Sequence, residues 1–169
     1  MTQRPKILGI AGWKNSGKTT LTEGLIAELT RRGLTVSAVK HAHHSFDVDH
    51  PGTDSFRHRA AGAREIAIVS QVRVAHIREL SGAPEPELEE TLSHFAPCDL
   101  VLVEGYKRVA IPKIEVRRLE SRSREPLAGT DPDIIAVAAD HPVKDTGLPT
   151  FQLGDVTAIA DFIIGWMGR

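Results

Sequence analysis

Gly12-Trp-Lys-Asn-Ser-Gly17-Lys18-Thr19 matches the pattern G-x-x-x-x-G-K-[ST], in which two glycines bracket a tight loop. The run 6–11 before it is short and apolar, as in a buried strand, and residues 18–32 after it carry one apolar helical stripe. Glycines let successive backbone N–H groups of such a loop point at an anion, and the helix N-terminus adds partial positive charge. This order of strand, loop and helix therefore predicts a phosphate-binding loop of the Walker A type.

Residues of this loop are the first candidates for contact with a nucleotide and Mg²⁺. Lys18 would reach the β- and γ-phosphates, and the Thr19 hydroxyl would complete the coordination of the metal. A hard cation also needs a carboxylate, and ligands of open α/β sheets bind at the carboxyl ends of strands. Asp99 precedes the apolar run 100–103 and Glu104 follows it, so we expect Glu104 to be the metal ligand. The candidates from the loop are Gly12, Asn15, Ser16, Gly17, Lys18, Thr19 and Thr20.

Strands and helices are expected to alternate along the rest of the chain. Further strands are predicted at 35–39, 100–103, 114–116 and 134–138, and helices at 54–61 and 155–167. A helix is also expected to start near Pro84 and Pro86 and to bury Leu88, Leu92 and Phe95.

Two β-rich runs, 65–69 and 72–77, are joined by Ser70-Gln71 and predict an antiparallel hairpin. Together the patterns predict one α/β domain over residues 1–169, of the P-loop NTPase class. We expect a mostly parallel central sheet with helices on both faces and the hairpin as an antiparallel excursion.

The composition is typical of a soluble globular domain. The chain has 169 residues, of which 41% are hydrophobic and 25% charged. With 21 Lys and Arg against 22 Asp and Glu, the net charge of −1 gives no global attraction to nucleic acid or membrane, and we expect neither as a partner. The single cysteine, Cys98, suits a reducing compartment, and the N-terminus resembles no secretory signal, so we expect a cytoplasmic protein.

A polar stretch after the strand 35–39 concentrates side chains that can bind metals. It contains His41, His43, His44, His50, Asp47 and Asp49. These donors could form a transition-metal site, but their spacing is loose. We favour a polar loop near the nucleotide, in which His41 and Asp49 position phosphate, water or the substrate of a partner protein.

Three more side chains are candidates for contact with the nucleotide, and two of them have an ordinary structural alternative. Asp54 begins the helix 54–61, where it is either a helix cap or a functional residue. Lys107 follows Glu104-Gly-Tyr and either faces the nucleotide cleft or is a solvated charge. Asp140, after the strand 134–138, is the candidate contact for a guanine base. The N-K-x-D motif of GTPases is absent, so the residues alone do not exclude adenine.

Four segments, in order, resemble the MobB family of molybdopterin-guanine dinucleotide biosynthesis proteins. The phosphate loop itself is shared with many proteins, whereas the later segments are far more specific. The segments are 12–21; Val39-Lys-His-Ala-His-His44 with Asp47 and Asp49; Gly52-Thr-Asp-Ser55 running to Ala61-Gly-Ala63; and Val103-Glu-Gly-Tyr-Lys107 with Pro112-Lys-Ile-Glu115. The resemblance covers nearly the whole chain.

The resemblance implies a function that the residues alone do not specify. It implies a homodimer that binds GTP and Mg²⁺, hydrolyses GTP weakly, and assists the attachment of GMP to molybdopterin. Nucleotidyl transfer would belong to a separate molybdopterin guanylyltransferase, with molybdopterin itself as a candidate ligand. This chain would be an adapter or nucleotide supplier.

Two other functions remain open at the level of the sequence. A P-loop small-molecule kinase would bind its acceptor with the polar stretch and cover the phosphates with an arginine-rich loop that acts as a lid. That loop contains Arg117, Arg118, Arg122 and Arg124. It could equally bind an anionic pterin phosphate or be a solvated charged loop. A metal-delivery GTPase would carry nickel or zinc on the histidines. No residue is identifiable as the group that orients water for hydrolysis, so catalytic residues are not assigned.

Overall fold

The computed structural model describes residues 4–42, 45–144 and 146–169. His43 and His44 of the polar stretch lie outside the described residues. The chain divides into two compact units: unit 1 contains residues 4–41 and 95–169, and unit 2 contains residues 42–94. The single domain expected over 1–169 stays a prediction.

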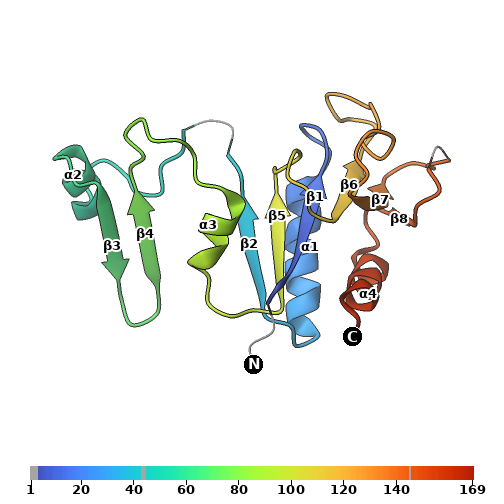
Figure 1. Ribbon diagram of the computed structural model, residues 1–169, viewed down its shortest axis with the longest axis horizontal. Helices are drawn as coiled ribbons and strands as arrows, with labels where there is room; N and C mark the ends of the chain where they lie inside the picture. Colours follow the sequence, from blue (N-terminus) through green and yellow to red (C-terminus); the bar gives the residue numbers. More distant parts are fainter. Residues whose placement is uncertain (1–3, 43–44, 145) are drawn as a thin grey trace. The chain divides into compact units, whose positions relative to one another are not determined.

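Unit 1 is built on a six-stranded sheet in which every neighbouring pair of strands is parallel, in the order β2-β5-β1-β6-β7-β8 (Figure 1). The strands are β1 (Lys6–Ala11), β2 (Val36–Lys40), β5 (Leu100–Glu104), β6 (Lys113–Arg117), β7 (Ile134–Ala139) and β8 (Thr150–Gln152). Parallel strands end at the same edge of a sheet, so the segments after β1, β5, β6 and β7 share the carboxyl edge.

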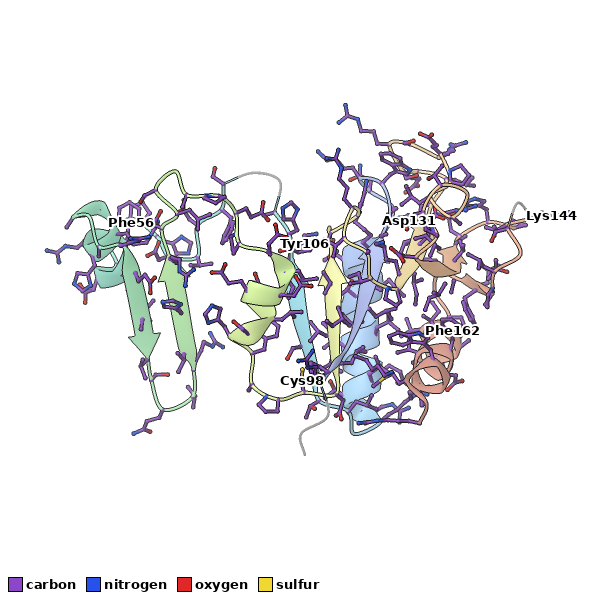
Figure 2. All side chains as sticks on the ribbon, in the orientation of Figure 1. Phe56, Cys98, Tyr106, Asp131, Lys144 and Phe162 are labelled. Atoms are coloured by element: carbon purple, nitrogen blue, oxygen red, sulfur yellow. The ribbon has the colours of Figure 1, made fainter. Side chains whose placement is uncertain are left out.

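Helices α1 (Lys18–Arg31) and α4 (Val156–Met167) pack against each other and contribute to the main core. Leu21, Leu25 and Leu29 of α1 recur at the helical period and are almost fully buried, as are Ile159 and Ile163 of α4. Burial of each such side chain contributes about 1.5–3 kcal/mol. The ring of Phe162, labelled in Figure 2, lies 5.4 Å from that of Phe151 at the edge of this core.

Loop residues, among them Leu127 and Leu148, cover a second, smaller core formed by Ala11, Ile134 and Val137. These three side chains come from β1 and β7, where the side chains of neighbouring positions belong to the main core. Since successive residues of a strand point to opposite faces, Ala11 and Val137 point away from the main core and its helices α1 and α4.

Strand β6 is unusual because it buries charged side chains. Lys113 and Glu115 are each 1% exposed, while Ile114 between them belongs to the main core. The Lys113 ammonium contacts Asp131 at 3.0 Å and Asp133 at 3.4 Å, both in the connection to β7. The two ion pairs of Lys113 therefore fix the end of the connection between β6 and β7.

Unit 2 contains the expected hairpin and two short helices. Its elements are α2 (Asp54–Ala60), β3 (Glu65–Val69), β4 (Val74–Arg78) and α3 (Leu88–Ser93). The hairpin pairs Glu65 with Arg78 and Val69 with Val74. Ser70 N–H donates to the Arg73 carbonyl at 2.9 Å and closes the turn.

The parallel sheet and the antiparallel pair confirm the expected class of fold, with differences at element ends. β4 starts at Val74 rather than at residue 72, because residues 70–73 form the turn. α3 starts only at Leu88 and ends at Ser93, so Phe95 lies beyond it. The short strand β8 was not predicted.

Candidate functional site

The phosphate loop has the backbone conformation that its glycines permit. Gly12 has φ 154°, and a Cβ added there would lie 2.6 Å from the Val116 carbonyl oxygen. Gly17, the residue before α1, has φ 89° in the left-handed region, as does Asn15 with φ 66°. A side chain at Gly12 would therefore displace the loop from the end of β6.

Lys18 folds back over the loop that it belongs to. Its ammonium donates a hydrogen bond to the Trp13 carbonyl at 2.8 Å. Burial lowers the pKa of Lys18, and the negative charge of Glu104 opposes that shift. The Ser16 hydroxyl is buried and finds no hydrogen-bond partner among the described residues. A buried polar group of this kind fits a loop built to receive a ligand.

Thr19 and Glu104 meet at the carboxyl edge of the sheet. The Thr19 hydroxyl lies 3.1 Å from one Glu104 carboxylate oxygen and 3.3 Å from the other. Glu104 is 4% exposed and forms an ion pair with Lys40, its register partner on β2. Two oxygen ligands in adjacent positions of an octahedral Mg²⁺ are roughly 3 Å apart, given bonds of about 2.1 Å. The Thr19 and Glu104 oxygens fit that requirement.

Asp99, the other acid that brackets β5, lies at the opposite edge of the sheet. Its carboxylate accepts hydrogen bonds from the Thr35 backbone N–H and hydroxyl, both at 2.7 Å. Arg169 pairs with it at 2.6 Å. The Thr35 backbone hydrogen bond, with help from the Thr35 hydroxyl and Arg169, lowers the pKa of Asp99 to about 2. Asp99 therefore fastens the start of β5.

The phosphate loop borders a cavity of about 440 Å³, here called the phosphate cavity, that the arginine-rich loop helps to line. Its lining is residues 15–20 with Arg118 and Glu120. Every loop candidate from the sequence except Gly12 lines this cavity. Arg118 donates to Glu120 at 2.8 Å, and its Nε lies 3.7 Å from Asp140.

Lys107 and Trp13 form a contact that the sequence did not predict. The Lys107 ammonium lies 4.0 Å from the centroid of the Trp13 ring, within the range of a cation–π interaction. Burial lowers the pKa of Lys107. Lys107 therefore packs on the phosphate loop and is not a fully solvated charge, and its contact with a nucleotide stays a prediction.

His41 lies beside Tyr106, with ring centroids 4.9 Å apart. Its backbone N–H donates to the Glu104 carbonyl at 2.8 Å. Gly105 has φ 99°, and a Cβ there would lie 3.0 Å from both His41 Cβ and the His41 carbonyl oxygen. The chain after β2 and the chain after β5 therefore run together next to the metal candidate Glu104.

The Asp140 carboxylate contacts Leu119 of the arginine-rich loop and the adjacent His141. It accepts from the Leu119 backbone N–H at 3.1 Å and contacts His141 Nδ1 at 2.8 Å. The hydrogen bond from His141 is the main cause that lowers the pKa of Asp140. A contact between Asp140 and a base stays a prediction.

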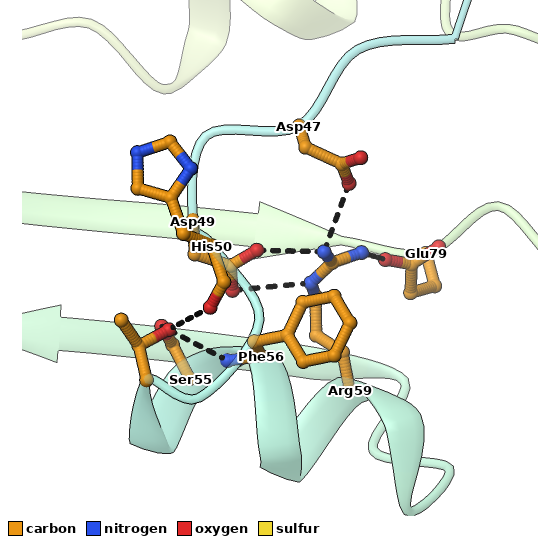
Figure 3. Close-up of polar contacts among 8 residues, drawn as sticks. Asp47, Asp49, His50, Ser55, Phe56, Arg59 and Glu79 are labelled. Carbon is orange, nitrogen blue, oxygen red and sulfur yellow. Dashed lines mark hydrogen bonds and ion pairs between the residues drawn. The ribbon is translucent and has the colours of Figure 1, made fainter.

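Asp49 and Asp54 belong to unit 2, and their expected contacts with a nucleotide stay predictions. Asp49 is buried and accepts from Arg59, whose guanidinium also pairs with Asp47 at 3.0 Å and Glu79 at 2.5 Å (Figure 3). Arg59 lowers the pKa of Asp49. Asp54 is exposed, and Thr53 rather than Asp54 caps α2.

A metal site of the kind that histidines and acids build is not found in the part of the chain that the structure describes. No group of three or more His, Cys, Asp or Glu side chains there could hold an ion. The described helices also include none with the length and apolar character to span a membrane.

The sequence missed residues whose contacts depend on the fold. Lys40 meets Glu104 only because β2 pairs with β5. Trp13 donates its indole N–H to the Glu125 carbonyl at 2.7 Å, across 112 positions of the chain. Arg118 was a candidate lid residue, but no pattern placed it at the phosphate loop.

The arrangement defines the P-loop NTPase class of proteins. It consists of a buried strand, a glycine-bounded loop, a helix that begins Lys-Thr, and an acid at the end of the neighbouring parallel strand. The family model described as molybdopterin guanine dinucleotide synthesis protein B (MobB) matches residues 7–140. The chain belongs to that family.

Relatives and solved structures agree with this assignment. A molybdopterin-guanine dinucleotide biosynthesis adapter protein of Escherichia coli is 39% identical over 166 residues, which cover 96% of this chain and 94% of that protein. The Haemophilus influenzae protein of the same name is also 39% identical, covering 99% of this chain and 92% of its own. A crystal structure of molybdopterin-guanine biosynthesis protein B aligns with a TM-score of 0.73 at 29% identity, covering 95% and 99% of the two chains.

Proposed function

We propose that this protein binds GTP with Mg²⁺ and serves as an adapter in the attachment of GMP to molybdopterin. A molybdopterin guanylyltransferase would catalyse the transfer, and molybdopterin would be the second ligand. One observation supports the binding of nucleotide and Mg²⁺: the Thr19 hydroxyl, next to Lys18 in the chain, lies 3.1 Å from the Glu104 carboxylate. The adapter role rests on membership of the family. The single cysteine suits a cytoplasmic protein.

Each residue of the loop has a task that its chemistry supports. Backbone N–H groups at the start of α1 bind the phosphates, and Lys18 leaves the Trp13 carbonyl to pair with them. Thr19 and Glu104 would hold Mg²⁺, which neutralises phosphate charge when bound. Lys40 balances the charge of Glu104.

Hydrolysis by the protein alone should be slow. Fast phosphoryl transfer needs a positioned water and additional positive charge, and an arginine supplied by a partner can contribute roughly 10³–10⁵ in rate. Among the described residues, Arg118 at the phosphate cavity is already engaged with Glu120. We expect GTP turnover well below the roughly 1–10³ s⁻¹ of typical enzymes.

The homodimer that the family resemblance implies has a suitable surface in unit 2. A two-stranded hairpin is marginally stable by itself in water. The β3–β4 hairpin leaves Val69, Val72 and Val74 mostly exposed, with Val72 at 94%. A second copy of the chain would cover these side chains and extend the two-stranded sheet. Sedimentation of the Val72→Lys and Val74→Lys variants tests this, since both should shift the protein towards the monomer.

Lys18→Ala tests the nucleotide site. The variant should keep its fold, because Lys18 makes only a loop contact, and should lose the thermal stabilisation that GTP and Mg²⁺ give the wild type. Lys14→Ala, which removes an exposed lysine of the same loop, is the matched control. A folded Lys18→Ala protein with wild-type GTP affinity would contradict the proposal. ATP in place of GTP in the same assay decides between the bases.

The adapter role is tested in a reconstituted reaction with the guanylyltransferase and molybdopterin. Wild-type protein should raise the yield of the dinucleotide, and Lys18→Ala should not. Equal stimulation by both would refute a nucleotide-supplying role.

A further inference from the structure

A second cavity, of about 390 Å³, lies beside the phosphate loop, and we name it the loop cavity. It is lined by Trp13, by residues 116–118, 121 and 123–126, and by residues 141–144. Its volume is within the range of small-molecule sites in proteins. None of the expected nucleotide contacts lines it, and the proposed function does not use it.

The walls of the loop cavity are held in place by backbone contacts. Trp13 donates its indole N–H to the Glu125 carbonyl at 2.7 Å, and Arg122 N–H donates to the Lys14 carbonyl at 3.0 Å. Glu115 accepts the N–H groups of Leu127 and Ala128 at 2.8 and 2.9 Å. The arginine-rich loop is therefore fastened to the phosphate loop at one end and to β6 at the other.

The lining combines an aromatic wall with an excess of positive charge. Trp13 offers an indole ring, and Pro126, Pro142 and Val143 add apolar surface. The charged lining residues are Arg117, Arg118, Arg124, Lys144 and Glu125.

Two of these cations are available to an anion. Arg117 is engaged with Glu115 at 2.9 Å and Arg118 with Glu120 at 2.8 Å. Arg124 donates only to the Leu119 carbonyl, and no carboxylate of the described residues pairs with Arg124 or Lys144. Lys144, labelled in Figure 2, lies on the segment that follows β7. The cavity thus joins a ring surface to two cations that no carboxylate in the described part of the chain neutralises.

We propose that the loop cavity is a second ligand site, which binds a fused nitrogen heterocycle that carries a phosphate group. The ring packs on Trp13 and the phosphate pairs with Arg124 and Lys144. Stacking of a base on an aromatic side chain contributes about 1–3 kcal/mol in other proteins. The choice of ligand rests on the proposed function, in which both GTP and molybdopterin have this chemistry. Because Arg118 lines both cavities, a ligand in one borders a ligand in the other.

The first experiment uses Trp13 as a reporter. The chain has two tryptophans, so Trp166→Phe leaves Trp13 alone. GMP, 6-hydroxymethylpterin phosphate or both should change the emission of Trp13 in this variant, whereas ribose 5-phosphate, which lacks the heterocycle, should not. Emission that stays unchanged at saturating concentrations of both heterocyclic phosphates would overturn the proposal.

The second experiment reverses the charge of the cavity. In calorimetric titrations, the Arg124→Glu/Lys144→Glu variant should bind 6-hydroxymethylpterin phosphate, GTP or both at least about tenfold more weakly, which corresponds to about 1.4 kcal/mol. Arg122→Glu is the matched control, because Arg122 is exposed on the same loop and does not line the cavity. Tripolyphosphate should bind both variants alike. Equal effects of the cavity and control variants on both heterocyclic probes would overturn the proposal.

The same titrations identify the source of the heterocycle. If it is the base of the nucleotide on the phosphate loop, the cavity variant loses GTP affinity. If it is a separate ligand, only the pterin phosphate is affected, and saturating tripolyphosphate with Mg²⁺ does not displace it. Lys18→Ala separates this proposal from the previous one, because it should abolish tripolyphosphate binding and leave pterin phosphate binding intact.

Discussion

Glu115 should contribute more to stability than any surface charge of the arginine-rich loop. Its buried carboxylate accepts two backbone N–H groups, from Leu127 and Ala128, and pairs with Arg117 at 2.9 Å. Glu115→Ala leaves all three donors without that acceptor. A buried donor without a partner costs about 1–3 kcal/mol, and removal of one member of a buried ion pair costs about 3–5 kcal/mol.

These costs are not additive, because the three donors share one acceptor and water can enter the space. We therefore expect Glu115→Ala to lower the free energy of unfolding by roughly 3–5 kcal/mol. For a chain of this size, that corresponds to a fall in Tm of roughly 6–20 °C. Urea denaturation followed by circular dichroism measures the first quantity, and calorimetry measures the second.

Glu120→Ala is the control on the same loop. Its ion pair with Arg118 joins side chains that are 76% and 37% exposed, so its removal should cost about 0–1 kcal/mol. Hydrogen exchange adds a local measurement, since the amides of Leu127 and Ala128 should lose protection in Glu115→Ala alone. If Glu115→Ala and Glu120→Ala unfold at the same urea concentration, the buried carboxylate does not hold the loop.

Two further predictions concern the acids that bracket β5. Glu104→Gln should remove the increase in GTP affinity that Mg²⁺ gives while most of the metal-free affinity remains, because the amide keeps the shape and loses the charge. Titrations with and without Mg²⁺ check this, and the same loss in Asp99→Asn instead would show that the wrong acid was chosen. Asp99 has a pKa of about 2 in the folded protein, below its value of about 3.9 in unfolded chains. The stability that ionised Asp99 provides is therefore complete above about pH 5 and lost as the pH falls towards 2. Asp99→Asn should be less stable than wild type at pH 7, and the difference in urea midpoint should shrink on acidification; a difference independent of pH would refute the linkage.

The strand, loop and helix at 6–31 were predictable because their signals are local. Each glycine of the phosphate loop acts through its own φ, and the apolar stripe of α1 repeats within one helix. The parallel sheet followed from the alternation of strands and helices. The strand β8 escaped prediction because its three residues are too few to show a period.

Contacts between distant segments were not predictable from the sequence. The pair Lys40–Glu104 requires that β2 lie next to β5 in one register, and sequence order does not specify strand order. In β6, charges at Lys113, Glu115 and Arg117 alternate with apolar residues, a pattern typical of a strand with one solvated face. The structure buries Lys113 and Glu115 instead, because the connection to β7 supplies their partners.

That connection explains how the site is assembled. Parallel strands are usually joined by a helix, which packs through an apolar stripe. Residues 118–133, all of them described, contain no helix, and polar contacts to Lys113 and Glu115 hold the segment in place of such a stripe. A helix at this point would carry the chain away from the carboxyl edge of the sheet. The first part of the irregular segment, residues 118–125, stays at that edge, where the Arg122 N–H donates to the Lys14 carbonyl. It brings Arg118 to Gly17, where a Cβ on the glycine would lie 3.1 Å from Arg118 Cδ. The charged face of β6 therefore positions Arg118, the one residue of the described chain that lines both the phosphate cavity and the loop cavity.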